Sequence, residues 1–438
     1  MNDAKTGTPW IEHESRAAVL AELHARPFVP LKVPRRIYHF AFETNRERAA
    51  ADRAAVAQLA RDHGAEPPAA DAKFHYLILG DWRLRWEQHT EFATYTWSTG
   101  VDAETPFRHP DPVAAGDIAF QQPGPLIVAT HLSVTGADTP LEDIAALFKS
   151  QSLCVIGIGK ESAHAFVDFA VDSHGFTRMA LRVRRASPME TGRLAQRMLE
   201  VETYRTMALL GLPLARAVTP EISAMEESLS DITHALSAGQ DPQSNQALLK
   251  RLSDILAANE ALATRTAFRF GASRAYHALV KNRLDLLQES KEGEYPTISN
   301  FLSARLDPAI ETCNAVEARQ TRFSTDVART TNLMRTGLTL DMERQNSALL
   351  DDMVRRTRLQ MRLNRMVQGI SVAGLAYYVV GLFAYFAKGL KEAGVLPATL
   401  SADMAEAIAV PFAIAVAWAF MARVRFLSKR AAKEELGD

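Results

Sequence analysis

The stretch that begins at Pro308 constrains the fold of this chain most, because its apolar side chains recur at steps of three, four and seven residues. Proline is favoured in the first turn of a helix, and only Gly337 interrupts the pattern afterwards. The stripe consists of Ile310, Cys313, Val316, Phe323, Val327, Met334, Leu338, Met342, Leu349 and Met353. One helix from Pro308 through the uncharged segment that follows would be about 120 Å long at 1.5 Å per residue. Such a helix cannot be buried in one compact domain, so we expect it to project, to join a bundle or to line an oligomer axis.

The uncharged segment after this stripe runs from Met366 to Ala387 and has 22 residues. A helix of that length crosses a hydrocarbon layer of about 30 Å. A second uncharged segment, Ala407 to Ala422, has 16 residues and becomes long enough when the residues just before it are included. The two segments predict a transmembrane hairpin with spans at 366–387 and 405–424 and a short external loop at 388–404.

Basic residues gather outside the two predicted spans. They are Arg355, Arg356, Arg358, Arg362 and Arg365 before the first span, and Arg423 and Arg425 with a basic tail, 425–438, after the second. Short loops rich in Lys and Arg stay on the cytoplasmic side. Both termini are therefore predicted to be cytoplasmic, with the lipid bilayer as a partner and these arginines at its interface, where they could also bind anionic lipid.

The part of the chain before the long helix divides in two by pattern. Residues 1–188 read as a mixed α/β cytosolic domain and 189–307 as a helical layer that leads into a stalk helix, 308–365. Strands are predicted by β-branched and aromatic runs at 35–43, 73–80, 125–134, 153–160 and on both sides of the turn Asp172–Gly175. The predicted fold class is an α+β cytosolic N-terminal domain followed by long helices and a C-terminal two-helix transmembrane hairpin.

Composition argues against several classes of partner and site. The 50 Lys and Arg balance 51 Asp and Glu, so no global basic field favours nucleic acid. The two cysteines, Cys154 and Cys313, match no metal or redox spacing, which suits a reducing compartment. The run Gly157–Lys160 resembles a fragment of a phosphate loop but lacks the following Ser or Thr.

Histidines do not point to a metal or catalytic site. Six of them are scattered on or near predicted strands without a ligand pair at short spacing: His39, His75, His89, His131, His164 and His174. No nucleophile elbow, zinc-protease helix or carboxylate pair is present. We therefore expect a protein that is not an enzyme and needs no cofactor, and the sequence leaves any metal unassigned.

Three segments resemble blocks of a bacterial family of uncharacterised membrane-anchored proteins, a domain of unknown function. They are ELHARPF at 22–28, LEVETYRTMALLGLPLA at 199–215 and LQMRLNRMVQGISVAGLAYYVVGL at 359–382. The resemblance covers nearly the whole chain. With the predicted spans, it implies a multi-pass protein of the bacterial inner (cytoplasmic) membrane, and it carries no activity.

The order of the parts resembles that of the CorA-type magnesium channels, pentamers whose long helices line a pore. The resemblance implies CorA-like architecture, a homo-oligomer such as a pentamer, and a cation pathway. That family carries a Gly-Met-Asn triplet at the outer end of its first span, whereas Tyr385 to Gly389 occupy this place here. The missing triplet puts magnesium selectivity in doubt and would require a different filter.

Polar and small side chains recur along the first predicted span at steps of three and four, and so share one helix face. They are Asn364, Gln368, Ser371, Gly374, Tyr378, Gly381 and Tyr385. In a symmetric oligomer this face could line a pore, with the two amides as rings of dipoles. Alternatively it packs against other helices, since small residues allow close approach and amides bond between helices.

Asp351 and Asp352 lie before the span and could form an inner acidic ring that concentrates cations. The competing interpretation pairs them with Arg355 and Arg356 at helical spacing. The leading expectation is a homo-oligomeric ion channel or transporter without assigned selectivity. The alternative is a non-conducting membrane-anchored scaffold whose α/β domain binds a partner.

Overall fold

The computed structural model describes residues 13–16, 19–20, 27–100, 106–107, 120–149, 151–238 and 242–394, and positions 404, 407, 410–412, 414–416, 418–420, 422–424 and 426. The chain divides into two compact units, Met1–Asn332 and Leu333–Asp438. The division falls inside one helix, α7 (Ile298–Glu392), which contributes its first part to the first unit.

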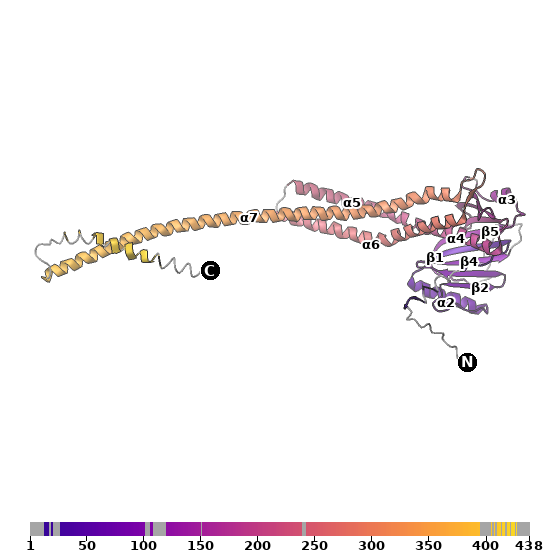
Figure 1. Ribbon diagram of the computed structural model, residues 1–438, viewed down its shortest axis with the longest axis horizontal. Helices are drawn as coiled ribbons and strands as arrows, with labels where there is room; N and C mark the ends of the chain where they lie inside the picture. Colours follow the sequence, from indigo (N-terminus) through magenta and orange to yellow (C-terminus); the bar gives the residue numbers. More distant parts are fainter. Residues whose placement is uncertain are drawn as a thin grey trace, which may run out of the picture. The chain divides into compact units, whose positions relative to one another are not determined.

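The first unit is built on a nine-stranded sheet in the order β2-β3-β4-β1-β5-β8-β7-β6-β9. Figure 1 labels four of these strands, β1, β2, β4 and β5. Its strands are β1 (Arg35–Glu43), β2 (Phe74–Leu79), β3 (Trp82–Gln88), β4 (Phe92–Gly100), β5 (Leu126–Thr135), β6 (Cys154–Ile158), β7 (Ala163–Val171), β8 (Thr177–Val183) and β9 (Ser290–Lys291). All neighbours pair antiparallel except β5 and β8, which are parallel. The predicted strand runs and the hairpin around Asp172–Gly175 are confirmed. Strands β3 and β4 were not among them.

The helices of the first unit begin and end where their sequences favour it. They are α2 (Arg46–Asp62), α3 (Leu141–Ala145), α4 (Pro188–Leu209), α5 (Gly211–Ser237), α6 (Pro242–Leu287) and the start of α7. The Asn45 side chain caps α2 by accepting the Arg48 N–H at 2.8 Å. Ser187 caps α4, with Pro188 in the first turn. After Gly157 and Ile158 end β6, Gly159 leads into a hairpin turn rather than the helix that a phosphate loop requires.

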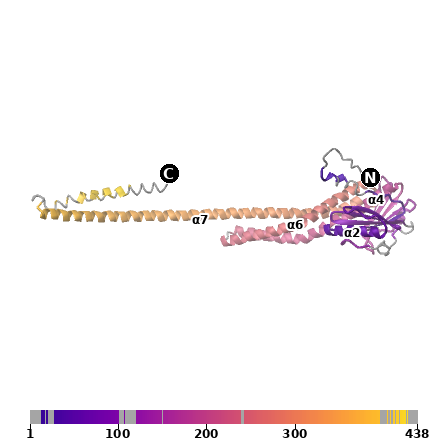
Figure 2. The ribbon, with the colours of Figure 1, turned by 90° about the horizontal axis from the view of Figure 1, so that it is seen from below.

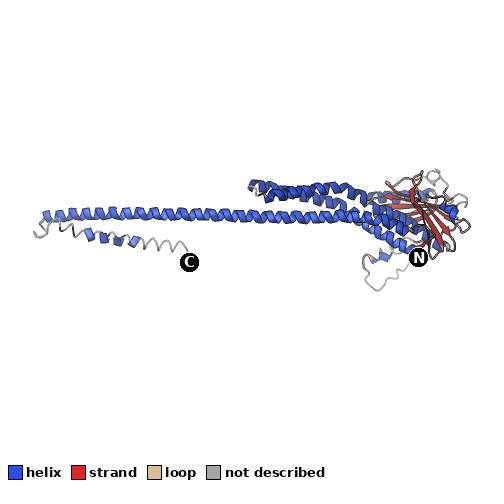
Figure 3. Cartoon of the chain, turned by 90° about the horizontal axis from the view of Figure 1, so that it is seen from above, coloured by secondary structure: helices blue, strands red, loops and turns tan. Residues whose placement is uncertain are grey.

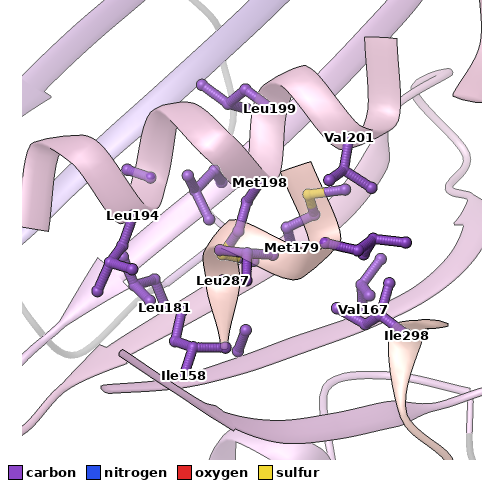
Figure 4. Packing of buried hydrophobic residues seen from close by; sticks show 14 of the residues in the cluster. Ile158, Val167, Met179, Leu181, Leu194, Met198, Leu199, Val201, Leu287 and Ile298 are labelled. Carbon is purple, nitrogen blue, oxygen red and sulfur yellow. The ribbon is translucent and has the colours of Figure 1, made fainter. Parts of the chain in front are cut away.

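The two faces of the sheet are covered by different helices. On one face, Trp86, Tyr95 and Trp97 pack with Val56 and Leu59 of α2. On the other face, α4 lies over β6, β7 and β8. Its Leu194, Met198 and Leu199 belong to the same buried cluster as Ile158, Val167, Met179 and Leu181 (Figure 4).

Helices α5, α6 and the start of α7 pack together beyond the sheet, and Figure 2 shows α6 running beside α7. Their shared core contains Ala215, Val218, Ile222, Leu262, Phe270, Cys313 and Val316. A polar residue, Asn259, is buried in this bundle. Its Nδ2 donates to the Gln320 carbonyl oxygen at 3.0 Å and to Ser324 Oγ at 2.8 Å. Such a pair fixes the register of α6 against α7.

The α+β class, with an N-terminal sheet domain and long C-terminal helices, is confirmed. The predicted stalk and first span form one continuous helix, α7 (Figure 3). Among the described residues, α7 alone is long and apolar enough to cross a membrane. The second apolar helix, Val410–Val424, is shorter than a span. The predicted two-helix hairpin is therefore not evident in the part of the chain that the structure describes, and one spanning helix by itself is weak support for a membrane location.

Candidate binding site in the sheet domain

A cavity of about 80 Å³ lies in the first unit between the sheet and α4. Strands β1 to β4 line it on one side. Helix α4 and a short strap, residues 29–31, line it on the other. One water needs roughly 10 to 15 Å³ of such space, so the cavity holds several waters or part of a small ligand.

The strand register places a row of polar side chains across the floor of this cavity. His39 of β1 pairs with Thr96 of β4, Thr96 with Arg85 of β3, and Arg85 with Tyr76 of β2. The next row contains Ser98 paired with Arg83. Since successive side chains in a strand point to opposite faces, the alternate residues carry the aromatic core against α2. One face of these four strands is thus apolar, and the other is a polar floor.

The strap closes the cavity because α4 has a glycine beneath it. A Cβ atom at Gly192 would come within 2.0 Å of the Val29 carbonyl oxygen. The Leu31 N–H donates to the Pro188 carbonyl oxygen at 2.8 Å. The missing side chain at position 192 therefore lets the strap backbone lie directly on the helix.

His39 is buried in the floor with both ring nitrogens engaged. Nδ1 lies 2.8 Å from Thr96 Oγ1, and Nε2 lies 2.9 Å from Thr203 Oγ1 of α4. The Thr203 hydroxyl donates to the Leu199 carbonyl oxygen, so it accepts from His39, which assigns the proton to Nε2. Burial lowers the pKa of His39 to about 4. A neutral histidine with both nitrogens bonded joins the sheet to α4 rather than acting as a base.

Glu87 and Arg85 form an ion pair in the floor. Arg85 Nε donates to Glu87 Oε1 at 2.5 Å, and its Nη1 donates to Gln196 of α4. Burial raises the pKa of Glu87, but the hydrogen bond from His89 and the charge of Arg85 outweigh this and bring the pKa down to about 2. The Arg85 charge is thereby neutralised within the site.

A second carboxylate at the rim of the cavity is also paired. Gln196 Nε2 donates to Glu200 Oε1 at 2.7 Å, and Arg283 of α6 donates to the other oxygen of Glu200. A neighbouring cavity of about 210 Å³ shares Glu87, Gln196 and Glu200 with the first. Both acidic groups of the site therefore already have an arginine.

Arg35 and Arg83 differ from Arg85. Among the residues that the structure describes, neither guanidinium has a carboxylate within ion-pair distance. The Nε of Arg35 is buried without a hydrogen-bond partner there. Burial lowers the pKa of Arg35, and the charge of Arg83 lowers it further. The floor thus carries two positive charges that repel each other.

The lining of the cavity combines polar and apolar side chains. No described group of three or more His, Cys, Asp or Glu could hold a metal ion. The described residues around the cavity provide charged and hydroxyl groups together with apolar side chains, namely Ile37 and Phe92 of the strands and Leu199 of α4. Pockets that combine apolar walls with a few convergent polar groups are typical ligand sites.

The site residues expected on the long helix all lie on α7. The pore-lining candidates Asn364, Gln368, Ser371, Gly374, Tyr378, Gly381 and Tyr385 occupy one continuous helical segment. Most are exposed, and the Ser371 hydroxyl donates to the Val367 carbonyl oxygen at 2.9 Å. None of them contributes to the cavity in the sheet domain.

The charged candidates on α7 are exposed. Asp351, Asp352, Arg355, Arg356, Arg358, Arg362 and Arg365 lie on this helix. Arg356 Nε forms an ion pair with Asp352 Oδ2 at 2.9 Å, which matches the interpretation of helical charge pairs. Arg423 lies on the described part of the second apolar helix, whereas Arg425 and most of the tail fall outside the described residues.

The cavity was not predicted from the sequence, because its residues form no local motif and share only a sheet face. The signal was present as alternation: Arg35, Ile37, His39 in one run, Arg83, Arg85, Glu87, His89 in another, and Thr94, Thr96, Ser98 in a third. Apart from Ile37, these alternate positions are polar, and such alternation indicates a polar sheet face. Only the pairing of the strands shows that the three runs adjoin.

Comparison with known proteins gives one match. The model of a family described as "Protein of unknown function (DUF3422)" matches residues 11–427. No curated protein and no solved structure shows significant similarity to the chain. The comparisons lend no support to the resemblance to CorA-type channels.

Proposed function

The chain belongs to the DUF3422 family of proteins of unknown function, and on this premise we propose that it is a membrane-anchored protein whose N-terminal domain binds a small polar ligand. The observation that carries the proposal is the cavity between the polar sheet face and α4. Binding is preferred to catalysis because both nitrogens of His39 are bonded and Glu87 is paired with Arg85.

The anchor is α7. An 18-residue stretch of this helix is apolar enough to cross a membrane, and none of it is buried within the chain. Ile370, Leu382 and Phe386 are each at least 65 % exposed. Leaving such side chains in water forgoes about 1.5 to 3 kcal/mol each. A bilayer supplies the missing apolar surroundings, and the arginines before the segment suit its cytoplasmic boundary.

A second pass through the membrane is supported by one contact. The rings of Phe383 on α7 and Phe412 on the second apolar helix are 6.4 Å apart. Helix Val410–Val424 thus has a neighbour inside the second unit. With both termini cytoplasmic, these two helices would form a multi-pass anchor in the inner membrane.

Membrane fractionation of expressing cells tests the anchor. The wild-type protein should remain in the membrane pellet at alkaline pH and enter solution only with detergent. Ile370→Lys combined with Leu382→Lys should release it, because two charges inside the apolar segment are costly in hydrocarbon. Leu340→Lys, on the exposed stalk before the segment, is the matched control and should stay with the membrane. Wild-type protein that is soluble without detergent would contradict the anchor.

Native mass spectrometry of the full-length protein in neutral detergent tests the ligand site. A panel of small molecules should yield adducts with the wild type. The Ser98→Trp variant should not form them, because its side chain fills the cavity. Wild type that binds nothing from polar, apolar and charged sets would refute the binding function.

A conducting homo-oligomer is the second candidate, favoured by the polar stripe from Asn364 to Tyr385 on one face of α7. The rival hypothesis, from a different class, is a non-conducting membrane-anchored scaffold in which the stripe packs between helices. Ion flux into liposomes separates them. Flux that falls in Gln368→Leu, Ser371→Leu and Tyr385→Ala supports a pore, and flux unchanged by these variants removes it.

A further inference from the structure

We propose that the cavity of the sheet domain binds a small organic anion, whose carboxylate or phosphate group sits between Arg35 and Arg83. The inference rests on the proposed binding function of the same cavity and names its ligand class. The inference is based on the two positively charged side chains of the site that take part in none of its described ion pairs.

The two acidic groups of the site do not compensate Arg35 and Arg83. Glu87 is bonded to Arg85, and Glu200 is bonded to Arg283. Within the described part of the chain, Arg35 and Arg83 have no carboxylate partner. Two guanidiniums on one face of the sheet repel each other and so destabilise each other's charged form. A bound anion would relieve that repulsion. The described site therefore has two arginines without a negatively charged partner, and one anion placed between them could bind both.

The position of the two arginines suits such a group. Ser98 pairs with Ile37 on one side and with Arg83 on the other, so its hydroxyl stands between the strands that carry the arginines. Arg35 precedes Ile37 by two residues and therefore points to the same face. Its buried Nε, which lacks a partner among the described residues, provides a free donor. A planar guanidinium matches the oxygens of carboxylate and phosphate.

The rest of the lining selects the body of the ligand. Val29 and Leu31 of the strap, with Leu199 of α4, give part of the opposite wall an apolar surface. A fully hydrated inorganic anion leaves that wall empty. An anionic group that carries a short apolar chain fills both parts of the cavity.

Isothermal titration calorimetry on full-length protein in neutral detergent tests the proposal. The probes are hexanoate, hexyl phosphate, inorganic phosphate and neutral hexanamide. We expect the two hexyl anions to bind at least tenfold more tightly than hexanamide and inorganic phosphate. The better of the two identifies the headgroup as carboxylate or phosphate.

Two variants connect that binding to the arginines. Arg83→Gln breaks no ion pair of the described structure and should weaken anion binding at least tenfold, as should Arg35→Gln. Arg61→Gln, on the exposed surface of α2, is the matched control and should bind like wild type. Circular dichroism of each variant checks its fold.

The outcomes distinguish failure of the anionic ligand class from failure of the binding function. Adducts of neutral molecules that Ser98→Trp abolishes, without anion binding, overturn the ligand class and keep the binding function. Anion binding that neither Arg83→Gln nor Arg35→Gln weakens places the anion elsewhere and overturns the proposal. If the protein binds neither the calorimetric probes nor any molecule of the mass-spectrometry panel, both the ligand class and the binding function are overturned.

Discussion

Gly192 of α4 lies so close to Val29 that an added Cβ atom would stand 2.0 Å from the Val29 carbonyl oxygen. Real Cβ atoms do not approach a backbone oxygen to that distance. The strap can therefore lie on α4 only while position 192 has no side chain. The same strap lines the cavity, so this contact between the strap and α4 also helps to shape the candidate ligand site.

Gly192→Ala is expected to push the strap off α4. The loss should be about 1 to 3 kcal/mol of unfolding free energy, the usual range for overpacking. Urea unfolding of the detergent-solubilised protein measures it. Gly271→Ala on α6 is the control, because its nearest neighbour is a flexible Arg274 nitrogen at 4.0 Å. In a helix interior that change should be neutral or stabilise by up to about 1 kcal/mol. Equal stability of both variants would contradict the close contact.

His39 should make stability depend on pH between about 4 and 6.5. Burial lowers its folded-state pKa to about 4, whereas the unfolded value is about 6.5. Between these pH values, the unfolded chain binds a proton at His39 and the folded chain does not. The contribution of His39 to the unfolding free energy is therefore fully present above pH 6.5 and decreases toward pH 4. The full effect is about 3 kcal/mol.

Urea unfolding across this pH range compares wild type with His39→Gln, which cannot titrate. The slope of stability against pH should be smaller in the variant. His174→Gln, in an exposed turn, is the control for removing a surface histidine. An identical slope in wild type and His39→Gln would show that His39 is not held neutral.

Glu87 should make stability depend on pH in a lower range than His39 does. Burial raises its pKa, but His89 and Arg85 outweigh burial and lower it to about 2. A carboxyl with a depressed pKa stabilises the fold above its unfolded value of about 4.3, and this contribution is lost as pH falls toward 2. Glu87→Gln should therefore cost about 3 kcal/mol at pH 7. Its deficit relative to wild type should shrink below pH 4.

The control for Glu87 is Glu161→Gln, whose side chain is 68 % exposed and 3.8 Å from Arg184. An exposed pair of this kind contributes no more than about 1 kcal/mol. A deficit of Glu87→Gln that stays constant from pH 7 to pH 2 would contradict the depressed pKa.

Gly211 should be intolerant of a side chain where α5 crosses the other helices. An added Cβ would lie 2.5 Å from Ser273 Oγ of α6 and 3.1 Å from Cys313 Sγ of α7. Gly211→Ala should lower the unfolding free energy by about 1 to 3 kcal/mol. Adding Ser273→Ala removes the nearer atom and should recover part of the loss. A double variant as unstable as the sum of the single variants would argue against this contact.

Much of the fold follows from local patterns. The stripe after Pro308 and the uncharged segment from Met366 predict a continuous long helix, and α7 runs through both. Strands such as β1 and β5 follow from their β-branched and aromatic runs. These patterns suffice because helix and strand periods depend on residues near one another in sequence. Strands β3 and β4 were not predicted, because polar residues at alternate positions interrupt their apolar runs.

The sequence by itself determined which residues alternate along each strand and that one long helix joins the stripe after Pro308 to the uncharged segment. It did not determine where that helix begins, because α7 starts at Ile298 and Pro308 lies inside it. The tertiary structure decided that β4 lies between β3 and β1, which brings Arg83 of β3 to the same sheet face as Arg35 of β1. It also decided that α4 covers that face, with His39 bonded to Thr203. The reason is physical: strand neighbours and helix docking are selected by contacts between distant parts of the chain. A binding site made from four strands and a helix therefore exists only once those contacts have formed.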